Sequence, residues 1–197
     1  MRTKKTTFVL IAGKAGVGKS TLGQYLSTKL SSVNGISVIT VPLASSLKRV
    51  AISAFGWDGV KDAKGRRLLQ VVGTEAGRGY NENIWVEKTV NFALTSSIYP
   101  PHFVIVDDWR YPNECSYIED LGVHNVVTIR VEASNREILK GTSEANHISE
   151  TSLPYGYAGN GHDDWYDLVI SNRGTFDELY EQGNEAFSYL EKNFIVR

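Results

Sequence analysis

The sequence predicts an α/β fold in which about five parallel strands form a sheet covered by helices on both faces. Short runs of apolar and β-branched residues alternate with longer helix-like segments, as expected when helices connect parallel strands. The run 102–106 is apolar almost throughout, which is typical of a strand buried on both faces. A chain of 197 residues suffices for one such domain and is short for two, so we expect a single domain over 1–197.

The first half of the chain has clear breaks between its expected elements. Pro42 ends an apolar run, because proline has no backbone N–H to donate to a sheet. Gly56-Trp57-Asp58-Gly59 breaks the helix-like pattern that follows Pro42. We therefore expect strands over 7–12 and 36–41, and helices over 20–30, 43–55, 64–75 and 84–96.

The second half carries signals for the ends of two helices. Gly122 is typical of the position just after a helix, where glycine adopts a left-handed conformation at low cost. Thr175 and Glu178 have the spacing of a capping box, which opens a helix. We expect strands over 102–106, 125–131 and 168–171, and helices over 113–121 and 175–193.

A glycine-rich loop lies between the first expected strand and the first expected helix. Its sequence, Gly13-Lys14-Ala15-Gly16-Val17-Gly18-Lys19-Ser20, matches the phosphate-binding pattern G-x-x-x-x-G-K-[ST] in full. Glycines let backbone N–H groups surround phosphate oxygens, and the helix N-terminus adds partial positive charge. Lys19 would reach the β- and γ-phosphates, and the Ser20 hydroxyl would bind Mg²⁺. We expect ATP and Mg²⁺ as cofactors, with Thr21 completing the nucleotide site.

Composition excludes several other classes of protein. The net charge is −1, so no overall basic field attracts a nucleic acid polymer. The single cysteine, Cys115, excludes an intrachain disulfide and fits a reducing cytosol. No apolar stretch approaches the length of a membrane span, and the polar start 1–6 has no signal-peptide core behind it. The expected location is therefore the cytoplasm.

The expected helix 64–75 carries a polar face. Leu68, Val71 and Val72 form an apolar stripe at about 100° per residue. The opposite arc holds Arg66, Arg67, Gln70, Gly73 and Thr74. Guanidinium groups beside amide and hydroxyl groups suit an anionic ligand such as a nucleoside monophosphate. A solvated helix face is the alternative interpretation.

Two acidic residues and an arginine follow the buried strand 102–106. In Asp107-Asp108-Trp109-Arg110 they lie at the carboxyl end of that strand, where ligands of open parallel sheets gather. Asp108 would hold Mg²⁺ or its waters, and Arg110 would bind phosphate oxygens. The alternative is an Asp108–Arg110 ion pair that only stabilises the turn.

Segment 132–165 interrupts the alternation of strands and helices. It is polar and rich in Gly, Ser and Asn, and a segment of this length inside a domain is usually functional. We expect a lid over bound nucleotides, with a flexible surface loop as the alternative. His147 and Glu150 lack the spacing of a zinc site, so we expect them to act as polar residues at the base of the lid.

Several segments together resemble the deoxynucleoside monophosphate kinases of tailed bacteriophages. The matching segments are 43–48, 56–59, 66–75, Trp85-Val86, Asp108-x-Arg110, 147–151 and 167–174, in order between about Thr7 and Leu179. Only the phosphate-binding loop is specific by itself; the others are persuasive as an ordered set. The chain departs from some relatives at Lys14-Ala15, where they have arginine, and at Ser20, where they have aspartate, which leaves the coordination of Mg²⁺ open.

The resemblance implies the fold of nucleoside monophosphate kinases, with ATP at the loop and a deoxynucleotide opposite it, over an acceptor region of about 43–98. The expected catalytic residues are Lys19, Arg67, Asp108 and Arg110, and Ser20 and Asp108 would bind Mg²⁺. The expected acceptor-binding residues are Lys48, Arg66, Arg67, Gln70, Thr74, Arg78, Trp85, Arg110 and Glu150. Asn172 follows the last strand, where the adenine could be held by backbone groups; an ordinary turn is the alternative.

The predicted reaction transfers the γ-phosphoryl group of ATP to a deoxynucleoside monophosphate. Two alternatives stay open: a kinase for another phosphorylated acceptor, because phosphomevalonate kinases share Asp-x-Arg and Asn-x-Gly features, and a module in which ATP only switches a conformation. The sequence leaves open the base preference, the sugar preference and a homodimer. A phage-encoded protein would act in the host cytoplasm.

Overall fold

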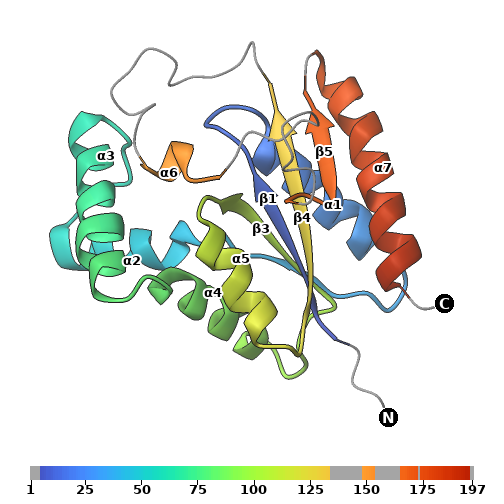
Figure 1. Cartoon of the computed structure of the whole chain (residues 1–197), viewed down its shortest axis with the longest axis horizontal. Helices are drawn as coiled ribbons and strands as arrows, with labels where there is room; N and C mark the ends of the chain where they lie inside the picture. The colour runs from blue at the N-terminus through green and yellow to red at the C-terminus, as the bar shows by residue number, and fades with distance from the viewer. Residues whose placement is uncertain (1–4, 134–147, 154–164, 173, 196–197) are drawn as a thin grey trace.

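A computed structural model describes residues 5–133, 148–153, 165–172 and 174–195 of the chain. Five parallel strands form one sheet in the order β2-β3-β1-β4-β5 (Figure 1). The strands are β1 (Thr7–Ala12), β2 (Val38–Thr40), β3 (Phe103–Trp109), β4 (Asn125–Glu132) and β5 (Leu168–Ser171). The predicted fold class is confirmed.

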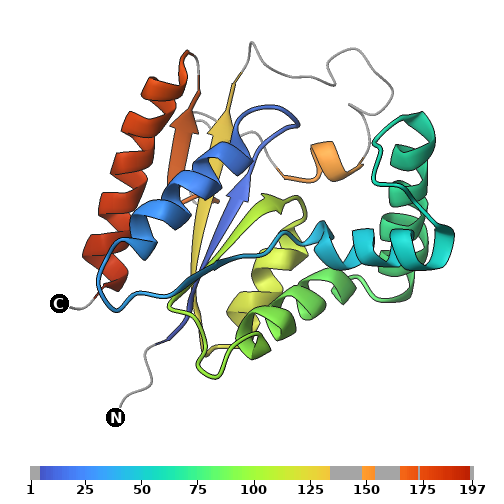
Figure 2. The same ribbon diagram turned by 180° about the vertical axis from the view of Figure 1, so that it is seen from behind.

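Helices cover both faces of this sheet. They are α1 (Lys19–Ser31), α2 (Ala44–Phe55), α3 (Ala63–Gln70), η1 (Val71–Arg78), α4 (Ile84–Thr95), α5 (Pro112–Asp120), α6 (Ile148–Thr151) and α7 (Phe176–Phe194). Figure 1 shows α5 in front of the sheet, and the reverse view in Figure 2 shows α1 crossing the other face. In both views α2, α3 and η1 extend to one side of the sheet.

The central strand β1 is buried at every position because each face of the sheet has its own apolar layer. Val9 and Ile11 pack in the layer under α1 and α7, whereas Phe8 and Leu10 pack in the layer under α4 and α5. A strand that alternates between two cores is apolar throughout, which explains the unbroken runs in the sequence.

The predicted helix 64–75 differs from the structure in form and in length. It consists of α3 followed by the π-helix η1, which continues to Arg78. Two glycines allow neighbouring helices to lie very close to η1: a Cβ at Gly73 would lie 2.8 Å from Leu47 of α2, and one at Gly77 would lie 2.6 Å from Trp85 of α4. π-Helical turns are rare and occur often at functional sites.

The segment expected to form a lid lies largely outside the described residues, which include only 132–133, α6 with Ser152 and Leu153, and Trp165 within it. In the part of the chain that the structure describes, no helix has the length and apolar character needed to cross a bilayer.

Candidate functional site

The loop 13–20 has the backbone conformation of a tight phosphate-binding turn. Gly13, Gly16 and Gly18 have φ angles of 145°, 83° and 106°, a region in which side chains are strained. A Cβ at Gly13 would lie 2.5 Å from the Val131 carbonyl oxygen, and one at Gly18 would lie 2.7 Å from Asn172 Nδ2. At these two positions the close approach of β4 and Asn172 leaves room for glycine only.

Lys19 begins α1 and reaches back over the loop. Its side chain is largely buried, and its Nζ donates to the carbonyl oxygens of Gly13 and Lys14 at 2.7 Å each. Within the described chain, no side chain caps the first turn of α1 and no acidic residue lies in it. The N–H groups of this turn therefore suit an anion, and the helix dipole favours one.

Asn172, which follows β5, binds the backbone of the loop 13–20. Its Nδ2 donates to the Val17 carbonyl oxygen at 2.9 Å, and its backbone N–H donates to Glu132 at 2.7 Å. Only 2% of the residue is exposed. Its place after β5 matches the prediction, and its side chain positions the loop. Binding of the adenine by backbone groups here stays a prediction.

An irregularity in β3 separates the two acidic residues. Leu10 pairs with Val106 and Ala12 pairs with Trp109, so β3 has one residue more than β1 at this point. Such bulges redirect side chains and are frequent beside active sites. Asp107 faces α1, where a Cβ at Gly23 would lie 3.2 Å from the Asp107 Cβ.

Asp108 caps α2. Its Oδ1 accepts from Leu43 N at 2.6 Å, and its Oδ2 accepts from Ala44 N at 3.0 Å. Burial raises the pKa of the Asp108 carboxyl, although these two backbone hydrogen bonds oppose the shift. Because both oxygens are already engaged, Asp108 is less suited to Mg²⁺ than the sequence predicted.

Asp107 was not selected from the sequence, yet it fits a metal ligand better. It shares the pocket with Ser20 and Lys19, and its buried Oδ1 accepts no hydrogen bond from any described residue. The described residues contain no cluster of three or more His, Cys, Asp or Glu side chains that would hold a metal alone. Mg²⁺ typically takes one or two protein oxygens and completes its shell with phosphates and water, so the pair of Ser20 and Asp107 fits this ion.

A single pocket of about 440 Å³ joins the loop to the helices α2, α3 and η1. Besides Lys19 and Arg78, four cationic residues line it: Lys48, Lys61, Arg66 and Arg110. Partial burial lowers the pKa of Lys61, and the charges of Lys48, Arg66 and Arg110 lower it further. The charge of Asp108 raises it. Among the described residues, no carboxylate forms an ion pair with Lys48, Lys61 or Arg66. Cations gathered around one pocket favour binding of an anion.

The polar face of α3 and η1 enters this pocket in part. Arg66, Gln70, Gly73 and Thr74 line it, as does Trp85, whose Nε1 donates to the Gly73 carbonyl oxygen at 2.8 Å. Arg67 does not line it: its side chain is 65% exposed and pairs with Glu75 at 2.8 Å. One residue of helix rotates a side chain by about 100°, which separates Arg67 from its neighbour.

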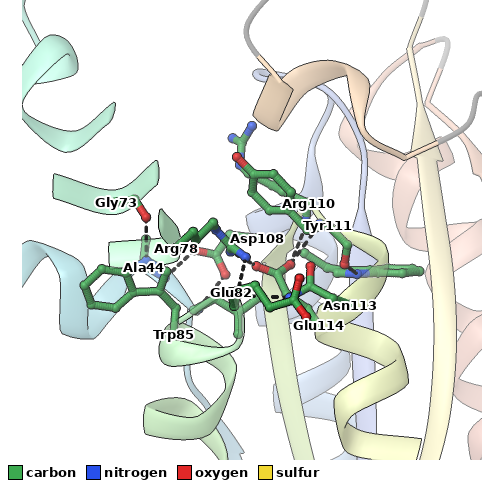
Figure 3. A network of polar contacts seen from close by, with 12 residues as sticks. Ala44, Gly73, Arg78, Glu82, Trp85, Asp108, Arg110, Tyr111, Asn113 and Glu114 are labelled. Atoms are coloured by element: carbon green, nitrogen blue, oxygen red, sulfur yellow. Dashed lines mark hydrogen bonds and ion pairs between the residues drawn. The ribbon is translucent and has the colours of Figure 1, made fainter. Parts of the chain in front are cut away.

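Arg78 reaches the pocket, but a buried network holds it (Figure 3). Its guanidinium group pairs with Glu114, donates to the Glu82 carbonyl oxygen at 3.1 Å and lies 3.8 Å from the centre of the Tyr111 ring. Its charge is thus largely balanced by Glu114, which limits its use as the direct phosphate clamp that the sequence predicted.

Glu114 is the hub of this network and was not selected from the sequence. Its Oε2 accepts from the backbone N–H groups of Arg110 and Tyr111 at 2.9 and 3.0 Å (Figure 3). Only 1% of Glu114 is exposed, and burial raises its pKa while Arg78 lowers it. Its place in the first turn of α5, after Pro112, is the one local signal that could have indicated it.

Two further predicted residues are not brought into the pocket by the described side chains. The side chain of Glu150 lies outside the described residues, although the backbone of α6 is described. Thr21 is partly buried in α1 and does not line the pocket.

No protein-family model and no curated protein matches the chain. Among solved structures, a protein named APE1195 is 16% identical with a TM-score of 0.55, over 97% of this chain and 98% of that one. The Mycobacterium tuberculosis APS kinase CysC, as a Cys556Ala mutant, is 14% identical over 95% and 98% of the two chains, with a TM-score of 0.48. A gluconokinase from Sinorhizobium meliloti 1021 is 11% identical over 98% and 97%, with a TM-score of 0.47. The likeness to APE1195 shows a shared fold, and the other two are too distant to carry an argument.

Proposed function

We propose that this protein is an ATP-dependent kinase whose acceptor is itself phosphorylated, and that this acceptor is a deoxynucleoside monophosphate. One observation carries the proposal: Lys19 and Ser20 of the loop share a single pocket with Lys48, Lys61, Arg66 and Arg110. A donor triphosphate at the loop and an acceptor phosphate at the four cations would face each other across that pocket.

A phosphorylated acceptor suits these residues for a chemical reason. The second pKa of a phosphate monoester is about 6, so the acceptor is mostly dianionic at neutral pH and needs no general base. The main obstacle is repulsion between two polyanions, and cations placed on both sides lower it. A neutral hydroxyl acceptor would instead need a base, and the two carboxylates that follow Val106 have other roles: Asp108 caps α2, and Asp107 would hold Mg²⁺.

The residues of this chain would divide the work of transfer. Lys19 would exchange its bonds to the Gly13 and Lys14 carbonyls for phosphate oxygens. Ser20 and Asp107 would hold Mg²⁺, which balances negative charge on the phosphates when bound. Arg110, whose backbone is held by Glu114, and Arg66 would orient the acceptor phosphate.

A nucleotide acceptor is favoured by the wall of the pocket beyond the cations. Trp85 is fixed there by its bond to Gly73, and Gln70 and Thr74 add an amide and a hydroxyl group. The ordered sequence segments that resemble bacteriophage deoxynucleoside monophosphate kinases support the deoxyribose form. A phage origin and action in the host cytoplasm remain predictions of the same resemblance, and a homodimer stays open.

Coupled ADP release with Mg-ATP would test the proposal against a panel of acceptors. The panel holds the common deoxynucleoside monophosphates, their ribose counterparts and mevalonate phosphate, with Lys19→Ala as the inactive control. We expect turnover with at least one deoxynucleotide and its loss in the control. Turnover of mevalonate phosphate alone would contradict the nucleotide acceptor but keep the kinase. Tight binding of ATP without turnover of any acceptor would favour a regulatory module.

A further inference from the structure

The loop 56–62 between α2 and α3 is folded tightly, although the sequence suggested only a break between helices. The Trp57 indole Nε1 donates to the Val60 carbonyl oxygen at 2.9 Å, and Asp58 Oδ1 accepts from Val60 N at 2.9 Å. Val60 is therefore held through both its carbonyl and its N–H group.

The residue on the other side of Lys61 is held as well. Asp62 Oδ1 accepts from Gly65 N at 2.7 Å and so caps α3. The loop lies against this first turn so closely that a Cβ at Gly65 would be 2.1 Å from the Val60 carbonyl oxygen and 2.7 Å from Trp57 Nε1. Lys61 is the residue between these two anchored neighbours.

The anchored loop positions Lys61 so that it lines the pocket. The charged groups that act on it come from three directions: Lys48 of α2, Arg66 of α3, and Asp108 and Arg110 from the end of β3. Three of the four are cations, and the oxygens of the single acid are bound by the N-terminus of α2. Lys61 itself stays exposed to solvent, so these neighbours disfavour its charge only in part, and an anion entering the pocket would relieve that effect.

We propose that Lys61 is a ligand of the acceptor phosphate, held in place by Trp57 and Gly65, and that its proton makes acceptor binding depend on pH. This inference rests on the proposed function, because it assumes that the acceptor carries a phosphate. In this site Lys61 would bind the phosphate together with Lys48 of α2, Arg66 of α3 and Arg110, which follows β3.

The direction of the pH dependence follows from the charges. Burial and the neighbouring cations lower the pKa of Lys61 from its usual value of 10.5. A bound phosphate dianion raises it again, so binding at alkaline pH takes up a proton. Acceptor affinity should thus fall as the pH rises toward the lysine range. Lys48 is another lysine that lines this pocket, so the variants of Lys61 decide whether Lys61 produces that fall.

Steady-state kinetics with Lys61→Met, Lys61→Arg and Lys64→Met test this inference. Lys64→Met is the matched control, since both lysines are exposed but Lys64 does not line the pocket. For Lys61→Met we expect the acceptor KM to rise about five- to tenfold, with the ATP KM within about twofold. Lys61→Arg should bind the acceptor well near neutral pH and lose the alkaline fall in kcat/KM, because arginine does not titrate there.

Calorimetry separates this inference from the proposed function. Inorganic phosphate is titrated into the protein saturated with a non-hydrolysable Mg-ATP analogue, in two buffers of different ionisation heat near pH ~9. We expect proton uptake in the wild type and in Lys64→Met, and none in Lys61→Met. Proton uptake that depends on Lys61, without turnover of any acceptor, would sustain this site while refuting the kinase. Normal kinetics and unchanged proton uptake in Lys61→Met would overturn the role of Lys61 and leave the kinase intact.

Discussion

Glu114→Gln is the most informative single perturbation of the buried network beside the pocket. Glu114 accepts hydrogen bonds from two backbone N–H groups and pairs with Arg78, and its side chain is 2% exposed. Glutamine has the same shape and keeps one oxygen for the backbone of Arg110 and Tyr111. Its N–H₂ group then faces Arg78, which leaves the guanidinium charge without its counter-charge.

The expected loss of stability follows from that uncompensated charge. Removing one partner of a buried ion pair costs about 3–5 kcal/mol. The Arg78 side chain is 13% exposed, which allows some solvation, so we expect the lower end, about 3 kcal/mol. For a domain of this size each kcal/mol corresponds to about 2–4 °C, so Tm should fall by roughly 6–12 °C.

Urea and thermal unfolding followed by circular dichroism would measure this loss. Glu75→Gln is the matched control, because the Arg67–Glu75 pair is 65% and 55% exposed and should contribute no more than about 0.5 kcal/mol. Adding Arg78→Met to Glu114→Gln removes the unpaired charge, and we expect the double variant to regain about 1–2 kcal/mol.

A loss below about 1 kcal/mol in Glu114→Gln would refute the reasoning, since it would mean that solvent or another group compensates Arg78. Strict additivity of the two substitutions would refute the coupling between Arg78 and Glu114. The acceptor kcat/KM should also fall in Glu114→Gln, because a neutral amide oxygen holds the Arg110 backbone N–H more weakly than a carboxylate does.

Three further predictions use single substitutions or a labelling reaction. Arg66→Ala should raise the acceptor KM about tenfold, whereas Arg67→Ala should leave it within about twofold, because only Arg66 lines the pocket; equal effects would contradict this. Gly65→Ala should displace the Val60 carbonyl and raise the acceptor KM without changing the ATP KM, and an unchanged acceptor KM would show that the loop adjusts. Burial raises the pKa of the Cys115 thiol to about 12, so a disulfide reagent near pH ~8 should label the unfolded chain rapidly and the native protein slowly; fast native labelling would contradict this.

Local patterns in the sequence predicted most of the fold. The sheet strands could be identified because a strand buried on both faces is apolar at consecutive positions, as in Thr7–Ala12. The phosphate-binding loop could be identified because its conformation depends on glycines at set positions, and Gly13 and Gly18 do have positive φ angles. Lys48, Arg66 and Arg110, which the sequence predicted to bind the acceptor, all line one pocket, and their role in binding stays a prediction.

Only the tertiary structure decided which neighbour of each polar pair is available to a ligand: Asp107 and Asp108 both line the pocket, but backbone N–H groups occupy the oxygens of Asp108. The choice of Asp107 over Asp108 as a free carboxylate depends on a bulge in β3 and on the backbone of α2. The separation of Arg66 from Arg67 depends on the rotation of α3, which is set by packing against other helices.

The roles of Lys61 and Glu114 could not be predicted from the sequence, because the residues around them come from segments distant along the chain. The sequence by itself determined the strands of the sheet and the phosphate-binding loop, since these follow from short-range periodicity and backbone conformation. It also showed which residues carry a positive charge. The tertiary structure determined which charges are buried together and which stay in water. The reason is physical: the interaction of two charges depends on their separation and on the solvent around them, and folding sets both.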